Sequence, residues 1–298
     1  MTRYRIRHRT HYEYGAPVDL SHHLLRLDLL ELPHQRVLDR RVAILPRPAA
    51  LREKRDHFGN GVAWIVLEMP HQSLTVELRA TVEVDRHAPR GPVASPPWEA
   101  IRATIRDDGF PSEPLVAEYG HVSPYALPTP GVQAYAAKSF PASCPVLEAV
   151  RDLTTRIHRD FTYVPGATDL STPVATVMAD RRGVCQDFAH VMIAGLRAVG
   201  LPARYVSGYL RTYPPAGADP HALRGADATH AWVGVWCGPE LGWIEFDPTN
   251  DLVVDEEHIV LAYGRDFGDI SPLRGVILGG GDHQPSVAVT VEPLPDAV

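Results

Sequence analysis

Residues 182–190 read RGVCQDFAH and begin an apolar run that extends to Val199. The run is long enough for a helix, and Gly200 with Pro202 marks its end. Cys185 therefore lies where the helix begins, and the positive end of the helix dipole favours a thiolate over a thiol there. A lone helical cysteine is more often a small buried hydrophobe than a nucleophile. The interpretation of this stretch therefore depends on two segments downstream.

The first segment is THAW at residues 229–232, and the second is WIEFDPT at residues 243–249. They supply His230 and Asp247, so a thiol, an imidazole and a carboxylate follow one another along the chain. These are the groups that a thiol nucleophile, its base and the orienting group of the base require. The two segments are predicted to pair as a hairpin with Trp232 opposite Asp247, which places His230 and Asp247 diagonally on one face. A slip of one residue would place them on opposite faces.

Other side chains near these segments are weaker candidates. Tyr163 could donate its hydroxyl to an oxyanion or pack as an aromatic side chain under a loop. Two further candidates for contact with the oxyanion or the substrate are Gln186, which follows Cys185, and Trp232, two residues after His230. Tryptophans on sheets, however, more often only pack. Asp187 is expected to cap the helix or to pair with an arginine, and His190 is expected on its polar side.

The remaining cysteines are interpreted as structural. Strand parity places Cys237 on the face away from His230, where it is expected to pack in the core, and Cys144 lies beside a helix start. Three cysteines at irregular spacing suggest no disulfide framework and fit a reducing compartment, so a cytoplasmic protein is expected. The chain contains no C-x-x-C and no H-E-x-x-H, so no metal site is expected.

The composition is that of a soluble globular protein. The chain has 298 residues, of which 45% are hydrophobic and 22% are charged, and its net charge is −7. An acidic balance argues against a phosphate-binding surface, so no nucleic-acid partner is expected. No apolar run approaches the roughly 20 residues that span a bilayer, and no apolar segment follows the basic N-terminus. Neither a membrane partner nor a signal peptide is therefore expected, and the oligomeric state cannot be read.

The chain divides into three predicted regions. Residues 1–87 contain short alternating strands separated by turns, with the clearest alternation over residues 74–84, and predict a β-sandwich-like domain. Residues 88–144 form a proline-rich connector with short helices. Residues 145–298 read as an α+β core that includes a final strand at residues 286–291. The loop Pro214 to Ala228, which includes Asp227, is expected to line the rim of the site.

The segments GVCQDFA (183–189), HAW (230–232) and FDPT (246–249) resemble the transglutaminase-like superfamily, in particular bacterial transglutaminase-like cysteine proteases. The resemblance extends over about residues 145 to 275, and the first 87 residues resemble the β-rich N-terminal region of these bacterial proteins. It implies a papain-like α+β core without a cofactor. It also implies Cys185 as nucleophile, His230 as acid and base, and Asp247 as the orienting group.

One departure limits what the resemblance implies. Gln186 stands where the calcium-dependent crosslinking enzymes of animals carry a tryptophan, and no acidic cluster resembles their calcium sites. Crosslinking activity is therefore not carried over. We expect hydrolysis of a peptide, isopeptide or other amide bond in a peptide or protein substrate, through a thioester at Cys185. Acyl transfer to an amine and a non-catalytic peptide-binding module are the alternatives.

Overall fold

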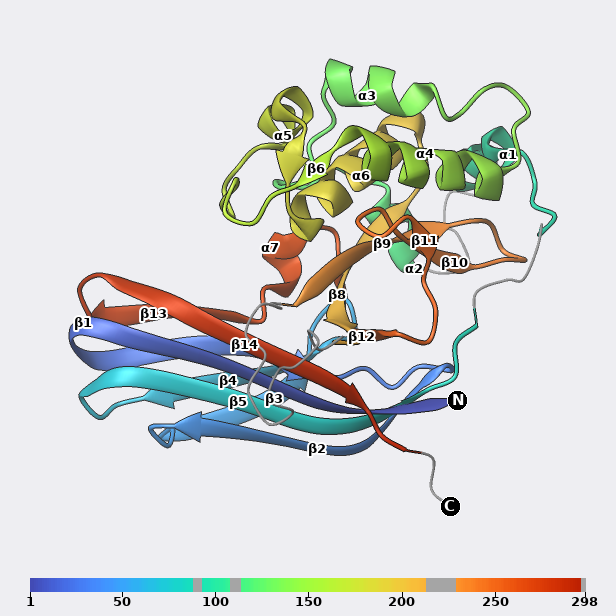
Figure 1. Cartoon of the computed structure of the whole chain (residues 1–298). Coiled ribbons are helices and arrows are strands. Elements are labelled where there is room, and N and C mark those ends of the chain that lie inside the picture. The colour runs from blue at the N-terminus through green and yellow to red at the C-terminus, as the bar shows by residue number, and fades with distance from the viewer. Residues whose placement is uncertain (88–92, 108–113, 213–228, 296–298) are drawn as a thin grey trace, which may run out of the picture.

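The computed structural model describes residues 1–87, 93–107, 114–212 and 229–295, and it contains two antiparallel sheets (Figure 1). The larger sheet has seven strands from both ends of the chain. The smaller sheet has five strands and is covered by helices. The predicted α+β architecture, with a β-rich N-terminal region before a core of helices on an antiparallel sheet, is confirmed. The loop Pro214 to Ala228, and Asp227 within it, lies outside the described residues.

The larger sheet is built around one long strand. Its members are β1 (Thr2–Asp28), β2 (Gln35–Leu45), β3 (Ala50–Arg55), β4 (Gly61–Leu67), β5 (His71–Val84), β13 (Leu273–Gly279) and β14 (His283–Pro293). One edge of β1 pairs with β5 and then with β4, and its other edge pairs with β14 and then with β13. β2 and β3 pair with β5 and β4. The sheet thus consists of four long antiparallel tracks. One is formed by β2 and β3, one by β4 and β5, one by β1 alone and one by β13 and β14.

The regular pairing of the four tracks changes at the same height along the sheet. The pairing of β1 with β5 changes register between Glu13 and Val18. Next to it, the chain between β13 and β14 turns at Gly279, Gly280 and Gly281, which all have positive φ. The interruptions lie together at one end of the sheet, on the left of Figure 1. Apolar side chains from both halves, including Ile6 and Ile65, belong to one buried cluster. The sheet is therefore continuous through β1, but the half around the first part of β1 and the half around its second part pack against each other as the two layers of a sandwich do.

The last two strands correct one expectation about domain organisation. We expected the C-terminal strand to belong to the catalytic core. Instead β14 pairs with the first half of β1 from Tyr4 to Tyr14, and β13 pairs with its second half. The alternating pattern at residues 286–291 identified a strand, but alternation carries no information about which sheet a strand joins. The chain begins and ends in the same sheet.

The core sheet has the order β11-β10-β9-β8-β12. Its strands are β11 (Leu252–Val253), β10 (Trp243–Asp247), β9 (His230–Trp236), β8 (Ala203–Leu210) and β12 (His258–Gly264). Trp236 lies opposite Trp243 and Val233 opposite Phe246, so the predicted hairpin register is confirmed. Ala231, Val233 and Val235 on β9 belong to the same buried cluster as the apolar side of the nearby helices. His230 and Trp232 belong to the other face by strand alternation.

The helices cover one face of the core sheet (Figure 1). They are α1 (Trp98–Asp107), α2 (Pro114–Tyr119), α3 (Pro130–Ala137), α4 (Val146–Asp160), α5 (Val174–Asp180), α6 (Cys185–Val199) and α7 (Phe267–Ile270). Thr129 Oγ1 accepts a hydrogen bond from the Val132 N–H at 3.3 Å and caps the start of α3. Within the described residues, none of these helices has both the length and the apolar character needed to cross a bilayer.

Two buried amide side chains join the N-terminal sheet to the outer edge of β12. The amide of Gln35 donates to the Val260 carbonyl at 2.8 Å and accepts from the Val260 N–H at 2.7 Å. The amide of Asn60 makes the same pair of bonds with Tyr263, both at 2.8 Å. Both side chains are at most 1% exposed. They satisfy backbone groups that an edge strand otherwise leaves unpaired, and they connect the two sheets directly.

Candidate active site

Cys185 is the first residue of α6 and is partly exposed. The short strand β7 (Arg182–Gly183) leads into it and pairs in parallel with β6 (Thr162–Tyr163). The first N–H groups of a helix have no acceptor within the helix, so they are available to an oxyanion formed beside the thiol. At the other end, Gly200 adopts φ 91° and ends the helix where the sequence predicted.

A buried carboxylate holds the start of this helix. Asp187 accepts hydrogen bonds from the Val184 N–H at 2.8 Å and from the Thr168 hydroxyl at 2.6 Å, so its predicted capping role is confirmed. A Cβ at Gly183 would lie 2.6 Å from Asp187 Oδ2. Glycine is therefore required at residue 183 by the capping carboxylate.

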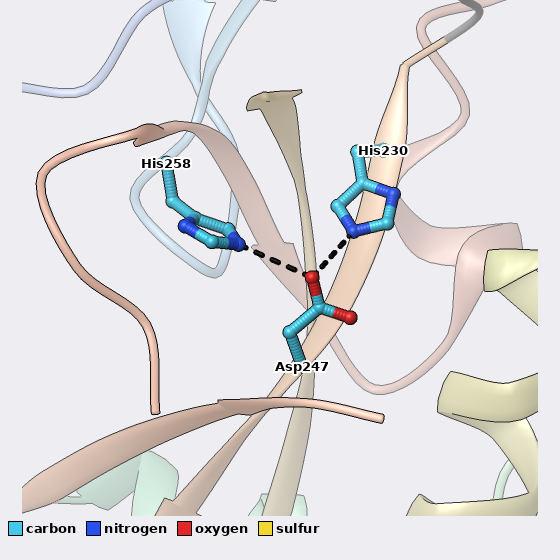
Figure 2. Close-up of side chains that lie close together, drawn as sticks. All are labelled: His230, Asp247 and His258. Carbon is cyan, nitrogen blue, oxygen red and sulfur yellow. Dashed lines mark hydrogen bonds and ion pairs between the residues drawn. The ribbon is translucent and has the colours of Figure 1, made fainter. Parts of the chain in front are cut away.

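His230 and Asp247 meet as the hairpin register predicted. His230 Nε2 lies 2.8 Å from Asp247 Oδ2, as Figure 2 shows. Burial alone would lower the pKa of His230, but the Asp247 carboxylate outweighs burial and raises it, and the nearby Cys185 thiol adds to the rise. Because Asp247 engages Nε2, the ring has Nδ1 left for Cys185. The structure thus brings together the three residues that the sequence singled out.

Asp247 is wholly buried and accepts hydrogen bonds on both oxygens. Oδ1 accepts the N–H of Thr249 at 2.8 Å and of Asn250 at 3.2 Å, while the Asn250 side chain donates to Oδ2 at 2.7 Å. Burial would raise the pKa of this carboxyl, but His230 and His258 outweigh burial and hold it well below its usual range. The carboxylate is therefore ionised and held in one orientation.

His258 is a member of the site that the sequence analysis missed. Its Nε2 faces the same Oδ2 of Asp247 (Figure 2), at 3.2 Å, and its ring is 1% exposed. It is the first residue of β12, at the far edge of the core sheet from β11. On the intervening strand β8, a Cβ at Gly208 would lie 2.3 Å from the Trp232 ring, so this glycine makes room for the side chains above it. No local sequence signal connects residue 258 with residue 247.

The same three side chains are the one group of possible metal ligands among the described residues. His230, Asp247 and His258 place their ligand atoms within 4.8 Å of one another. However, Oδ2 of Asp247 already accepts two imidazole groups and one amide, and the raised pKa of both histidines favours protons over a cation. The arrangement is that of two protonated imidazoles hydrogen-bonded to one carboxylate.

Trp232 lies beneath this group and not on the surface. Its ring is 0% exposed, and its indole N–H donates to Glu245 Oε2 at 2.8 Å. Of the two roles considered for Trp232, packing is the one that the structure has, because neither the ring surface nor the N–H is available to a substrate. Glu245 also accepts from Arg86 at 2.8 Å and from Arg204 at 3.2 Å. These arginines outweigh burial, which alone would raise the pKa of Glu245, and hold it well below its usual range.

Tyr163 and Gln186 lie beside the thiol-bearing end of α6. Tyr163 is half-exposed, pairs with Gly183, and has its ring edge-on to Phe188 at 6.3 Å between centroids. Gln186 follows Cys185 in the first turn of α6 and is partly buried. Both positions are compatible with contact to a substrate at Cys185.

His190 differs from its expected position. It was expected on the polar side of α6, but it is 3% exposed and stacks on Tyr125 with centroids 5.8 Å apart. Its Nε2 accepts the Phe267 N–H at 3.2 Å. Burial lowers the pKa of His190 to about 3, so this ring is neutral and structural. Three segments distant in sequence supply its contacts, since Tyr205 also packs against the ring at 5.1 Å between centroids, and helical periodicity alone does not reveal them.

The other cysteines lie away from the group. Cys237 is buried in the core beside β9, where burial raises its pKa to about 12. Cys144 is partly exposed and packs against the same core, and burial followed by nearby acidic groups raises its pKa as well. Among the described residues, neither thiol has an imidazole partner.

Residues 4–83 match the family model of the bacterial transglutaminase-like N-terminal region. Residues 134–248 match the model of the transglutaminase-like superfamily. An uncharacterized protein of Mycobacterium tuberculosis is 42% identical over 301 residues, which cover 98% of this chain and 93% of that protein. The chain belongs to the transglutaminase-like superfamily. The resemblance seen in the sequence is thereby confirmed.

Two further proteins are similar over different lengths. A solved structure from Cytophaga hutchinsonii, described as a putative cysteine protease, superposes with a TM-score of 0.75 at 22% identity. The match covers 100% of this chain and 92% of that one, so the whole fold is shared. The protein-glutamine gamma-glutamyltransferase of Pseudomonas aeruginosa is 39% identical over 127 residues, which are 39% of this chain and 19% of that protein.

Proposed function

We propose that this protein is a thiol-dependent hydrolase that cleaves an amide bond in a peptide or protein substrate through a thioester at Cys185. The observation that carries the proposal is the imidazole of His230, held by the buried Asp247 carboxylate beside a thiol at a helix start. The raised pKa of His230 supports a protonated imidazole next to a thiolate. The fold shared with a protein described as a putative cysteine protease adds support.

The proposed reaction begins when Cys185 Sγ bonds to the carbonyl carbon and the carbonyl oxygen becomes an oxyanion. The first N–H groups of α6 stabilise this oxygen, and Tyr163 and Gln186 are the candidate side chains beside it. The C–N bond then breaks as His230 gives its proton to the leaving amine. Water next attacks the thioester and gives a proton to His230. When the C–S bond breaks, the thiolate and the protonated imidazole are restored.

The pH dependence of iodoacetamide alkylation tests the pair directly, with peptide mapping to separate the three cysteines. Cys185 should react well below the ordinary cysteine pKa of about 8.5, and His230→Ala should shift its profile upward. Cys237 is an internal control, because burial raises its pKa to about 12 and covers it. A Cys185 that reacts as an ordinary thiol in both proteins would contradict the proposal and favour a non-catalytic peptide-binding module.

Acyl transfer to an amine is the second candidate function. The similarity over 127 residues to the gamma-glutamyltransferase of Pseudomonas aeruginosa favours it. Hydrolysis and transfer share the thioester and differ only in the group that attacks it. Adding a primary amine during turnover and searching for the amide product by mass spectrometry separates them. Acid product alone supports hydrolysis, whereas amide product in preference to acid supports transfer.

The proposal includes the setting of the enzyme. The three free cysteines are compatible with a reducing compartment, so we place the protein in the cytoplasm. A peptide or protein is the proposed partner, with no part for nucleic acid or membrane. Fractionation of cells followed by detection of the chain tests the location, and recovery with the membrane or exported fraction would contradict it.

A further inference from the structure

We propose that His258 is a positioning residue, which holds Asp247 in the orientation that keeps His230 directed at Cys185. The inference rests on the proposed function, because it assigns a role within the same site. Its starting point is the sharing of one oxygen: Asp247 Oδ2 accepts His230 Nε2 at 2.8 Å and His258 Nε2 at 3.2 Å (Figure 2). Both rings approach this oxygen from separate strands, β9 and β12.

The hydrogen bonds of His258 require it to be a cation. Its second nitrogen, Nδ1, lies 3.4 Å from Asp255 Oδ1, so a carboxylate faces each ring nitrogen. Ionised carboxylates only accept hydrogen bonds, so both nitrogens must carry protons for both bonds to form. Burial alone would lower the pKa of His258, but Asp247 and Asp255 outweigh burial and raise it. Among the described residues, His230 is the other charged group that faces the ring, and its positive charge acts in the opposite direction.

This cation affects His230 through the bond that it donates to Asp247. As a donor, His258 occupies a buried oxygen that would otherwise lack one of its partners and could rotate away from His230. The ring cannot touch the substrate itself, since it is 1% exposed and lies behind Asp247. It acts only through the carboxylate.

The position of His258 is set by the fold beyond the catalytic core. β12 is held on one edge by β8 and on the other by the buried amides of Gln35 and Asn60 from the N-terminal sheet. The first residue of this clamped strand is His258. The N-terminal sheet therefore supports the catalytic carboxylate through a rigid strand, and the role of His258 does not require any movement.

The test compares His258→Leu with His258→Gln and with His8→Leu. Leucine removes both donors, whereas glutamine restores one N–H donor toward Asp247. His8 is a matched control, because it is also 1% exposed and has hydrogen bonds on both nitrogens, to Tyr209 and Thr10, in the N-terminal sheet. Iodoacetamide is the probe at Cys185, and thermal unfolding followed by circular dichroism establishes that each variant is folded.

We expect His258→Leu to alkylate Cys185 roughly tenfold more slowly at pH 6, with its pH profile shifted upward, because one charge-assisted bond to Asp247 is lost. His258→Gln should recover most of the rate, and His8→Leu should retain the wild-type profile. Nitrogen-15 NMR of the histidine rings gives a second readout. In His258→Leu the His230 Nε2 resonance should lose its hydrogen-bonded shift.

The outcomes separate this inference from the proposed function. A folded His258→Leu with the wild-type pH profile and the wild-type His230 resonance would overturn the positioning role and leave the Cys185–His230 pair intact. An ordinary Cys185 thiol in the wild type would overturn the proposed function, while the His230 resonance still decides whether His258 positions Asp247. If His258→Leu does not fold, Asp255→Asn decides the question, because it removes the second carboxylate that faces the His258 ring. A wild-type profile and His230 resonance in Asp255→Asn would then reject the role.

Discussion

Glu245 and Asp247 lie two residues apart on β10, point to the same face and are both at most 1% exposed. Their partners differ in kind. Glu245 is bound by the guanidinium groups of Arg86 and Arg204, with Trp232 and Tyr263 as further donors. Asp247 is bound by the imidazoles of His230 and His258 and by Asn250. One strand therefore carries two buried carboxylates in two different electrostatic settings.

The difference follows from the chemistry of the partners. A guanidinium keeps its charge at every pH at which the protein is folded, so the Glu245 cluster is a permanent ion group that fixes the sheet. An imidazole gains and loses a proton near neutral pH, so the Asp247 cluster can take part in proton transfer. The two clusters touch through Trp232, whose ring lies 5.2 Å from the His258 ring. A structural support thus lies directly beneath the proposed catalytic group.

The largest expected effect is on stability, in Glu245→Gln. Removing this charge leaves Arg86 and Arg204, each 14% exposed, without their shared counter-ion. Breaking a buried charge pair by removing one partner costs about 3–5 kcal/mol. Urea unfolding followed by tryptophan fluorescence measures this loss. The Cys185 alkylation profile of the folded protein should remain within about threefold of wild type, and a lost profile would mean that the two clusters are not separate.

The next effect is on reactivity, in the matched variant Asp247→Asn. The amide lacks the negative charge that raises the pKa of His230, so the protonated imidazole beside the Cys185 thiolate is less favoured. Alkylation at pH 6 should fall by about a hundredfold, toward the rate of a thiol with an ordinary pKa of about 8.5. Mass spectrometry of the labelled peptide measures the rate. Equal reactivity in Asp247→Asn and wild type would remove Asp247 from the mechanism.

The smallest effect is the pH dependence of stability above neutrality. His230 and His258 have a raised pKa in the folded protein, so each keeps a proton that the unfolded chain releases above about pH 6.5. Their contribution is complete below that pH and is lost as the pH rises toward their folded pKa values. Between pH 7 and pH 9 the free energy of unfolding should fall by about 1–3 kcal/mol.

The two carboxylate variants separate the sources of this alkaline loss. Glu245→Gln should retain the decrease, because arginines do not titrate in this range. Asp247→Asn should reduce it, since both histidines lose the carboxylate that raises their pKa. Urea unfolding at a series of pH values gives the slopes. On the acid side both carboxylates act alike: their lowered pKa stabilises the fold above about pH 4, and this is lost as the pH falls.

Local patterns in the sequence sufficed for much of the candidate site. Residues 229–237 and 242–247 are joined by a short loop, so alternation alone placed His230 and Asp247 on one face, and the structure has that register. The start of α6 at Cys185, its end at Gly200 and the capping by Asp187 depend on neighbours within a few residues. The resemblance to the transglutaminase-like superfamily rested on the same short segments. All of these features depend on residues that are close to one another in the sequence.

Tertiary structure decided the features that depend on distant segments. His258 reaches Asp247 because β12 pairs with β8. Arg86 precedes the proline-rich connector in the sequence and still contacts Glu245 on β10. The C-terminal strands pair with β1, and Trp232 and His190 are enclosed by residues far from them in sequence. Strand order and burial follow from how whole sheets pack, and alternation does not specify which strand becomes the neighbour. The sequence by itself determined which groups could react, while only packing determined which groups support them.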